Sequence, residues 1–216
     1  MTEQLDDSQE DDSTNILVEK MISEAWSPAD ILYYGPSSRS ILLAGDITKD
    51  TTVPIVSQLL ELDAREPGEP ITLYINTEGG ALCDAFSLYD TALNIESPIV
   101  TVANGLCASA GLLLLCAGDL KLCYPNTIFF YHQAIMPADI FSSKENAIST
   151  TEAYVMSQEM YDAALIERTK IKKSIWKKEF EGCTSKYFGA EEAQKYKFVN
   201  GILKQTKKPK IELQEL

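Results

Sequence analysis

Residues 104–118 read Asn-Gly-Leu-Cys-Ala-Ser-Ala-Gly-Leu-Leu-Leu-Leu-Cys-Ala-Gly, and the interpretation of the whole chain depends on this stretch. It follows an apolar run at 99–103 that predicts a buried strand, and its apolar end at 112–117 predicts a buried helix. Ser109 stands at the junction, where the unpaired N–H groups and dipole of the helix N-terminus favour negative charge. The position suits a nucleophile whose reaction develops an oxyanion, and it also suits a serine that caps the helix or fills a small space.

Predicted strands and helices alternate on both sides of this stretch. Strands are predicted at 40–45, 71–76, 99–103, 120–124, 127–132 and 198–203, and further helices at 52–64, 81–94 and 190–197. Such alternation is typical of an α/β fold with right-handed crossovers and a mainly parallel sheet. Ligands bind such sheets at the carboxyl ends of the strands. Gly79, Gly80 and Ser109 each follow a strand end, so we expect them at the same edge of the sheet.

Two predicted helices carry apolar residues that indicate their packing. On the helix at 52–64, the expected buried side consists of Val53, Val56, Leu59, Leu60 and Ala64. A longer helix is predicted at 143–172, with apolar residues at helical spacing: Ala147, Ala153, Met156, Met160, Ala164 and Leu165. A helix of about 25 residues would span roughly 37 Å, which is too long to fold over a small sheet. We therefore expect a protruding arm that contacts a partner subunit, with an ordinary surface helix as the alternative.

Composition and charge exclude several classes of protein. The chain has 216 residues, enough for one domain, and its net charge of −13 argues against nucleic acid as the main partner. No apolar run is long enough to cross a membrane and no secretory signal is visible, so we expect a cytoplasmic protein, with the plastid stroma or a virus-encoded cytosolic form as alternatives. The five cysteines lack metal-ligand spacing and read as small buried residues, and we expect no metal and no cofactor.

The sequence divides into four predicted segments. Residues 1–14 are predicted to be a disordered acidic tail, because the first 13 residues carry six acidic residues and no basic one. Residues 15–38 form a predicted N-terminal arm, 39–203 the folded domain and 204–216 the C-terminal tail. Within the domain, the long helical arm is expected at about 139–172.

His132 is the only histidine of the chain, so a serine nucleophile activated by an imidazole requires this residue. It ends a predicted strand and could reach Ser109 at the same edge of the sheet, and a structural or exposed histidine is the alternative. Gly79 and Gly80 offer backbone N–H groups without an obstructing side chain. Together with the N–H of Ala110 they provide what an oxyanion hole needs, although Gly-Gly also suits a plain turn.

Four blocks of the sequence resemble, in the same order, blocks of the proteolytic subunit of the Clp protease. Residues 71–90 resemble its Leu-Tyr-Ile-Asn-Ser-Pro-Gly-Gly block, and 105–115 resemble its nucleophile block, Gly-x-Ala-Ala-Ser-Met-Gly-Ala. Residues 124–133 resemble its Leu-Pro-Asn-Ser…His-Gln block, and 190–203 its closing Ala-x-Glu-Ala segment. The resemblance implies a crotonase-like α/β fold for residues 39–203, with repeated ββα units, a mainly parallel sheet and a protruding helix, the handle.

The resemblance also implies a function for this domain. Ser109 would be the nucleophile and His132 the general base of a serine endopeptidase that cleaves peptides or unfolded polypeptides, with Gly79, Gly80 and Ala110 lining the oxyanion hole. The subunits would form two stacked seven-membered rings, as a homo-oligomer or as mixed rings, joined through their handles. A ring-shaped ATPase unfoldase would be the partner that supplies substrate.

One position departs from the family pattern. The aspartate that completes the triad aligns with Ser185, which is followed by Lys186. A hydroxyl orients the imidazole without stabilising its charge, so we expect reduced activity, or as the alternative a catalytically weak or inactive structural subunit of a mixed ring. A third hypothesis is a crotonase-like acyl-CoA enzyme, whose catalytic carboxylate would have to be Glu78 or Asp84.

Overall fold

The computed structural model of the chain describes residues 39–134, 144–181 and 185–204, with only the backbone of residues 144 and 145. Several segments for which the sequence made predictions lie outside the described residues. They are the acidic tail 1–14, the N-terminal arm 15–38, residues 139–143 of the handle, residue Cys183 and residues 205–216 of the C-terminal tail. The described residues thus include most of the predicted domain.

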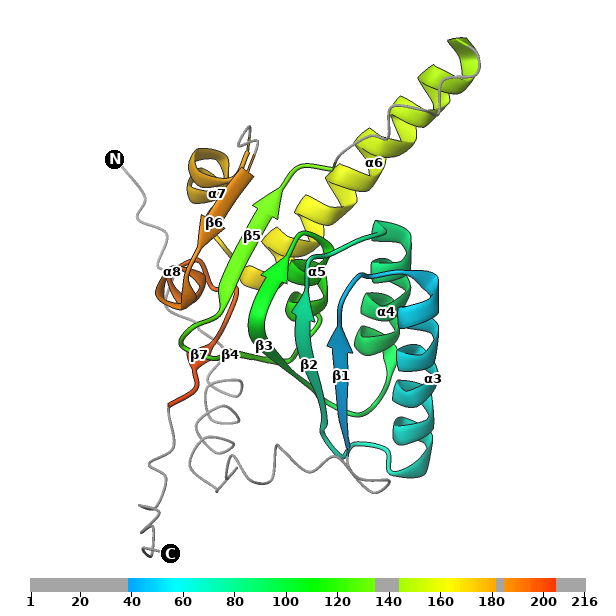
Figure 1. Cartoon of the computed structure of the whole chain (residues 1–216), viewed down its shortest axis with the longest axis vertical. Helices are drawn as coiled ribbons and strands as arrows, with labels where there is room; N and C mark the ends of the chain where they lie inside the picture. Colours follow the sequence, from blue (N-terminus) through cyan, green and yellow to red (C-terminus); the bar gives the residue numbers. More distant parts are fainter. Residues whose placement is uncertain (1–38, 135–143, 182–184, 205–216) are drawn as a thin grey trace, which may run out of the picture. The chain divides into compact units, whose positions relative to one another are not determined.

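One sheet of seven strands forms the centre of this part (Figure 1). Its strands are β1 (Ser40–Ala44), β2 (Ile71–Thr77), β3 (Ile99–Ala108), β4 (Leu120–Cys123), β5 (Ile128–His132), β6 (Ser185–Phe188) and β7 (Gly201–Ile202). The order is β1-β2-β3-β4-β7, while β5 pairs with β3 and with β6. Only the β5–β6 pair is antiparallel among these pairings. The expected α/β fold with a mainly parallel sheet is confirmed.

The helices of this part are α3 (Lys49–Arg65), α4 (Leu82–Asn94), α5 (Ala110–Cys116), α6 (Lys144–Thr169), α7 (Lys173–Glu179) and α8 (Ala190–Lys195). The first four of these helices pack in sequence order: α3 contacts α4, α4 contacts α5 and α5 contacts α6 (Figure 1). Every residue of α5 is buried, as its apolar sequence predicts. Among the helices of the described residues, none combines the length and the apolar character needed to cross a membrane.

β3 changes its neighbours along its length, and this places Ser109. Residues 99–103 pair with β2 and β4, whereas residues 106–108 pair with β5. Gly105, at φ +73°, lies between the two parts, and Asn76 accepts a hydrogen bond from the N–H of Leu106. From the extent of the apolar run, the sequence predicted a strand that ends at residue 103. In the structure Asn-Gly is a bend within one strand, which continues to the residue before Ser109.

The buried side of α3 was predicted partly wrongly. Val53 and Leu60 are each 52% exposed and Ala64 is also exposed, whereas Thr52, Ile55 and Leu59 are buried. Thr52 can be buried because its hydroxyl donates a hydrogen bond to the carbonyl of Thr48 (2.9 Å). Apolar residues stand on both sides of this helix, so periodicity alone did not identify the side that faces the core.

The two halves of α6 differ in burial. Tyr161, Ala164 and Leu165 are buried in its C-terminal half, whereas large apolar residues further towards its N-terminus are about half exposed: Ile148, Val155, Met156 and Met160. Figure 1 shows the N-terminal half of α6 extending beyond the sheet, as expected for a protruding helix. Met156 and Met160, predicted on the apolar face, are thus exposed in the single chain.

A cluster of aromatic residues supports β5 and β6 from α7. Phe180, directly after α7, is fully buried, and its side chain lies 4.8–6.0 Å, between ring centroids, from those of Tyr131, Trp176, Phe188, Tyr196 and Phe198. Neither α7 nor β6 was predicted from the sequence, because both are short and neither has a clear apolar period. Through Tyr131 and Phe188, this cluster holds the strand pair that carries His132 and Ser185.

Phe180→Ala is expected to lower the free energy of unfolding by about 3–5 kcal/mol, because it leaves a cavity among these aromatic side chains. The measurement is urea unfolding at fixed protein concentration. Ile175→Ala serves as the control, since Ile175 lies on α7 and is 38% exposed. An equal loss in both variants would show that the cluster is not what stabilises this end of the sheet.

Candidate active site

Ser109 has a strained backbone conformation at the junction of β3 and α5. Its φ of 53° and ψ of −124° lie in a region that residues other than glycine rarely adopt, at a cost of about 1–3 kcal/mol. Ser109 occupies the N-cap position of α5, yet its side chain makes no capping hydrogen bond. The helix-cap alternative considered for this serine therefore does not explain its conformation.

The main chain of Ser109 is held on two sides. Its N–H donates to the carbonyl of Phe130 on β5 (2.7 Å). Its carbonyl accepts from the N–H of Leu112 (2.9 Å) and from the hydroxyl of Tyr161 on α6 (2.8 Å). Burial raises the pKa of Tyr161 well above its ordinary value, so this hydroxyl stays protonated and remains a donor. The candidate nucleophile is thus fixed to the strand of His132 and to the long helix.

Gly79 lies directly against Ser109. A Cβ on Gly79 would be 2.6 Å from the Cβ of Ser109 and 3.2 Å from the nitrogen of Ala110. Gly80 pairs with Ile47, whose carbonyl oxygen would collide with a Cβ at Gly80. Both glycines have positive φ, +101° and +149°. The structure therefore brings Gly79, Ser109 and Ala110 together and has room for no side chain at either glycine.

The backbone donors around Ser109 differ in their hydrogen bonding. The N–H of Gly79 donates to the hydroxyl oxygen of Thr77 (2.9 Å), and that hydroxyl donates to the carbonyl of Gly45 (2.6 Å). Ala110 is the first residue of α5, so its N–H has no acceptor within the helix. Thr77 was not among the candidate site residues, although a threonine two residues before a glycine is a known turn signal.

His132 is half-buried at the end of β5, and its ring lies against Phe130 with 5.2 Å between the ring centroids. Its Nδ1 is 2.6 Å from the carbonyl oxygen of Gln133. Because a carbonyl oxygen only accepts, Nδ1 is the nitrogen that carries the hydrogen in this contact. The other nitrogen, Nε2, is then the one that can accept a proton while the imidazole is neutral.

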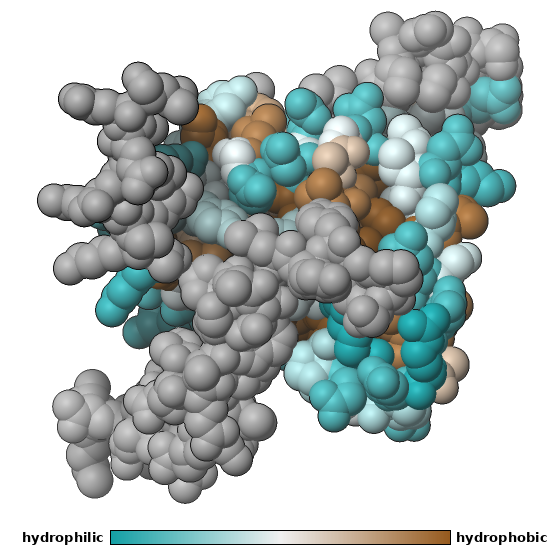
Figure 2. Space-filling view, turned by 60° about the horizontal axis from the view of Figure 1, so that its bottom comes forward, coloured by the Kyte–Doolittle hydropathy of each residue, from teal (hydrophilic) through white to brown (hydrophobic). Residues whose placement is uncertain are grey.

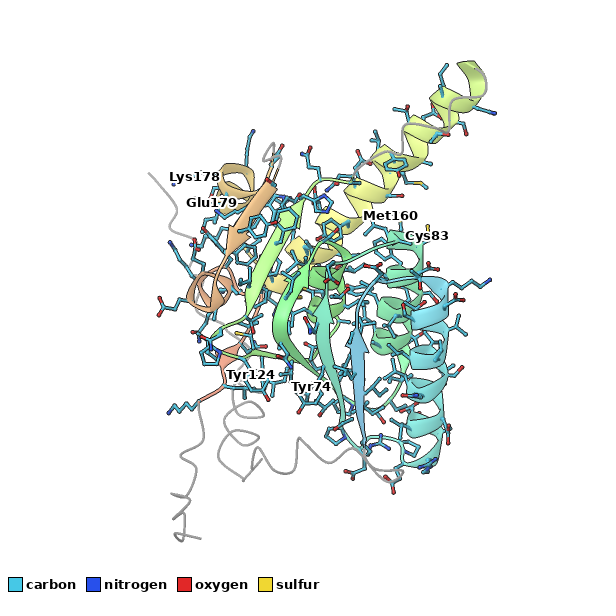
Figure 3. All side chains as sticks on the ribbon, in the orientation of Figure 1. Tyr74, Cys83, Tyr124, Met160, Lys178 and Glu179 are labelled. Carbon is cyan, nitrogen blue, oxygen red and sulfur yellow. The ribbon has the colours of Figure 1, made fainter. Side chains whose placement is uncertain are left out.

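Ser185 is paired with His132 in the antiparallel register of β5 and β6. Residues directly opposite each other have Cβ atoms about 4.5–5.5 Å apart, with side chains on the same face. The position at which an aspartate was expected therefore lies beside the imidazole. The neighbouring Lys186 directs its ammonium group to Glu179 (2.6 Å), which Figure 3 labels on α7. This hydrogen bond lowers the pKa of Glu179, whose carboxylate is thus already paired.

Three polar residues on one turn of α6 reach the same region, and none of them was predicted as a site residue. Besides Tyr161, Gln158 accepts from the N–H of Ala134 through Oε1 (2.6 Å) and donates through Nε2 to Asp162 (2.8 Å). The hydroxyl of Tyr131 also donates to Asp162 (2.8 Å). Burial raises the pKa of Asp162, although these two hydrogen bonds act in the opposite direction. The only sequence signal was their spacing, which a solvent-exposed helix face shows equally well.

The cysteines and acidic residues of the described part form no further site. Cys107, Cys116 and Cys123 are buried free thiols, as expected, whereas Cys83, on the first turn of α4 (Figure 3), is exposed. Burial raises the pKa of Cys116 and of Cys123 to about 11, so neither is a ready thiolate. Within residues 39–134, 144–181 and 185–204, no group of three or more histidine, cysteine or acidic side chains could hold a metal ion.

A comparison with known protein families agrees with this site and fold. The model of the Clp protease family matches residues 27–206, which is more than half of the chain. The matched region contains the candidate residues from Gly79 to Ser185 and every described strand of the sheet. The mostly parallel sheet with its flanking helices fits the crotonase-like fold expected for this family. The chain therefore belongs to the Clp protease family.

Proposed function

We propose that this chain is a serine endopeptidase subunit that cleaves peptides or unfolded polypeptides, with Ser109 as nucleophile and His132 as general base. The conformation of Ser109 is the observation that best supports this proposal. A positive φ in a residue with a Cβ is costly, and the hydroxyl gains no capping hydrogen bond in return. Strain of this kind presents a nucleophile at a strand-to-helix turn in other hydrolases.

In the proposed reaction, Oγ of Ser109 attacks the carbonyl carbon of a peptide bond while Nε2 of His132 takes the hydroxyl proton. The tetrahedral intermediate then breaks its C–N bond, and the same proton passes from Nε2 to the leaving amine. Water attacks the resulting acyl-enzyme, with His132 again removing and returning a proton, and releases the carboxylate product and free Ser109. The Nδ1–H contact to Gln133 supports this assignment because it leaves Nε2 as the basic nitrogen.

The proposed oxyanion hole consists of the N–H groups of Gly79, Gly80 and Ala110. Ala110 supports this assignment most directly, since it opens α5 beside Ser109. The N–H of Gly79 is bonded to Thr77 in this structure, so it would have to turn from that hydroxyl to a substrate oxyanion. Each such donor contributes about 10²–10³ to the rate of an acyl transfer.

Members of the Clp protease family generally form oligomeric rings. We propose that this chain does so through α6, as two stacked seven-membered rings of one chain or of mixed subunits, served by a ring-shaped ATPase unfoldase in the cytoplasm. The exposed apolar residues of α6, from Ile148 to Met160, support a partner at this helix. Figure 2 shows hydrophobic residues at the surface of the described part between hydrophilic ones.

A structural subunit without activity is the second candidate, and Ser185 beside His132 is the observation that favours it. A fluorophosphonate probe separates the two candidates. We expect it to label wild-type protein on Ser109, and we expect the rate to fall at least about 10³-fold in Ser109→Ala and in His132→Ala. Hydrolysis of a fluorogenic peptide by the purified oligomer should fall in parallel.

Ser57→Ala is the matched control, because Ser57 is an exposed serine on α3, and it should label like the wild type. If wild-type protein neither labels nor cleaves peptides under conditions in which an active serine peptidase does both, the chain is the structural subunit.

A further inference from the structure

We propose that Gln158 and Asp162 of α6 are positioning residues for His132, acting through the Gln133–Ala134 peptide group in place of the missing triad carboxylate. This inference rests on the proposed function, since it concerns the general base of that reaction. It assigns to the long helix a role at the active site in addition to any role at a subunit interface.

One peptide group joins the imidazole to α6. Its carbonyl belongs to Gln133 and lies 2.6 Å from Nδ1 of His132. Its N–H belongs to Ala134 and donates to Oε1 of Gln158, also at 2.6 Å. Because a peptide group is planar and rigid, the bond on its N–H side fixes the direction of its carbonyl. The same bond polarises the carbonyl and makes it a better acceptor for Nδ1–H.

Asp162 determines which way the amide of Gln158 faces. Its carboxylate oxygen accepts from Nε2 of Gln158 (2.8 Å) and from the hydroxyl of Tyr131 (2.8 Å). An ionised carboxylate only accepts, so the NH₂ group of Gln158 must face Asp162 and its oxygen must face Ala134. Each group in this chain of hydrogen bonds therefore donates towards Asp162 and accepts from the side of the imidazole.

The hydrogen bonds from Asp162 to the imidazole replace part of the function of a triad aspartate. It holds the ring and selects the tautomer with hydrogen on Nδ1, as a carboxylate would. The negative charge, however, lies two hydrogen-bonded groups away from the imidazole, so it stabilises the protonated ring less. Tyr161, on the same turn of α6, meanwhile bonds the carbonyl of Ser109. One helical turn thus supports the main chain at both proposed catalytic residues.

The single histidine makes a direct test possible. In protein labelled with ¹⁵N-histidine, the solid-state ¹⁵N spectrum of sedimented oligomer contains one imidazole, whose two nitrogens report the tautomer. Wild type should show hydrogen on Nδ1. Gln158→Ala should shift the population to the other tautomer or to a mixture, and should slow fluorophosphonate labelling of Ser109 at least about 10-fold, since the wrong tautomer disables a triad.

Asp162→Asn keeps an acceptor in place without the charge. It should preserve the Nδ1–H tautomer and slow labelling less than Gln158→Ala does. Because burial raises the pKa of Asp162, the folded state disfavours its ionised form, so removing the charge should not lower the melting temperature at pH 7. Gln58→Ala, at an exposed glutamine of α3, should change neither the tautomer nor the rate.

An unchanged tautomer in folded Gln158→Ala would overturn this inference, and so would hydrogen on Nε2 in the wild type. These readouts do not depend on activity. If the wild type does not label, but its tautomer has hydrogen on Nδ1 and Gln158→Ala shifts that population, the proposed function fails while the positioning role stands. If the wild type labels and Gln158→Ala changes nothing, the positioning role fails alone.

Discussion

Replacing Ser185 by aspartate is expected to raise the rate of fluorophosphonate labelling and of peptide hydrolysis by about 10-fold or more. Removing the aspartate from a complete triad lowers kcat by about 10⁴, and this sets the upper limit of the gain. The strand register supports the prediction, because Ser185 is directly opposite His132 and a carboxylate there is within reach of Nδ1. Lys186 would not neutralise it, since its ammonium already binds Glu179.

The gain should come from charge as well as orientation, and Ser185→Asn separates the two. Asparagine has the shape of aspartate and can accept the Nδ1–H bond, but it carries no charge to stabilise a protonated imidazole. We therefore expect little gain from it, because the Gln133 carbonyl already orients the ring. Equal rates in the aspartate and asparagine variants would show that charge at this position does not limit the reaction.

The sequence predicted the layout of the fold because its strands and helices are long and periodic. β2, α4 and the first half of β3 lie where the apolar runs placed them, within one or two residues. α7 and β6 were not predicted, because α7 is stabilised by packing around Phe180 and β6 by pairing with β5. Such packing and pairing produce no apolar periodicity in the sequence. Nor does any sequence pattern indicate that Asn-Gly at 104–105 is a bend inside β3.

The candidate site was predictable to the extent that it depends on strand ends. Gly79 and Ser109 meet because β2 and β3 are parallel neighbours that end at the same edge. The support of His132 was not predictable in this way. Its Nδ1 partner is a main-chain carbonyl, which has no residue-type signature. The N–H of that peptide group is held by Gln158, which lies 24 residues further along the chain.

Gly79→Ala is expected to reduce labelling and peptide hydrolysis by at least about 10²-fold. The new methyl carbon would lie 2.6 Å from the Cβ of Ser109 and 2.9 Å from the carbonyl oxygen of Ala108, both closer than van der Waals contact allows. Neither neighbour can rotate away, because one is backbone and the other is bonded directly to it. Ser109 must therefore move, and a displacement of about 1 Å at a reacting group costs about 10² in rate.

Backbone strain at Gly79 adds to this steric effect, and a second glycine separates the two. Gly68 also has positive φ, +83° against +101°, but a Cβ there would meet nothing within 4 Å. Gly68→Ala should therefore lower the melting temperature through backbone strain and leave the labelling rate of the folded protein unchanged. Gly79→Ala should be labelled more slowly than the wild type even at temperatures at which the variant is folded. If the two variants label equally fast at a temperature well below both transitions, Gly79 does not determine the position of Ser109, and the assignment of Gly79 to the oxyanion hole loses its structural support.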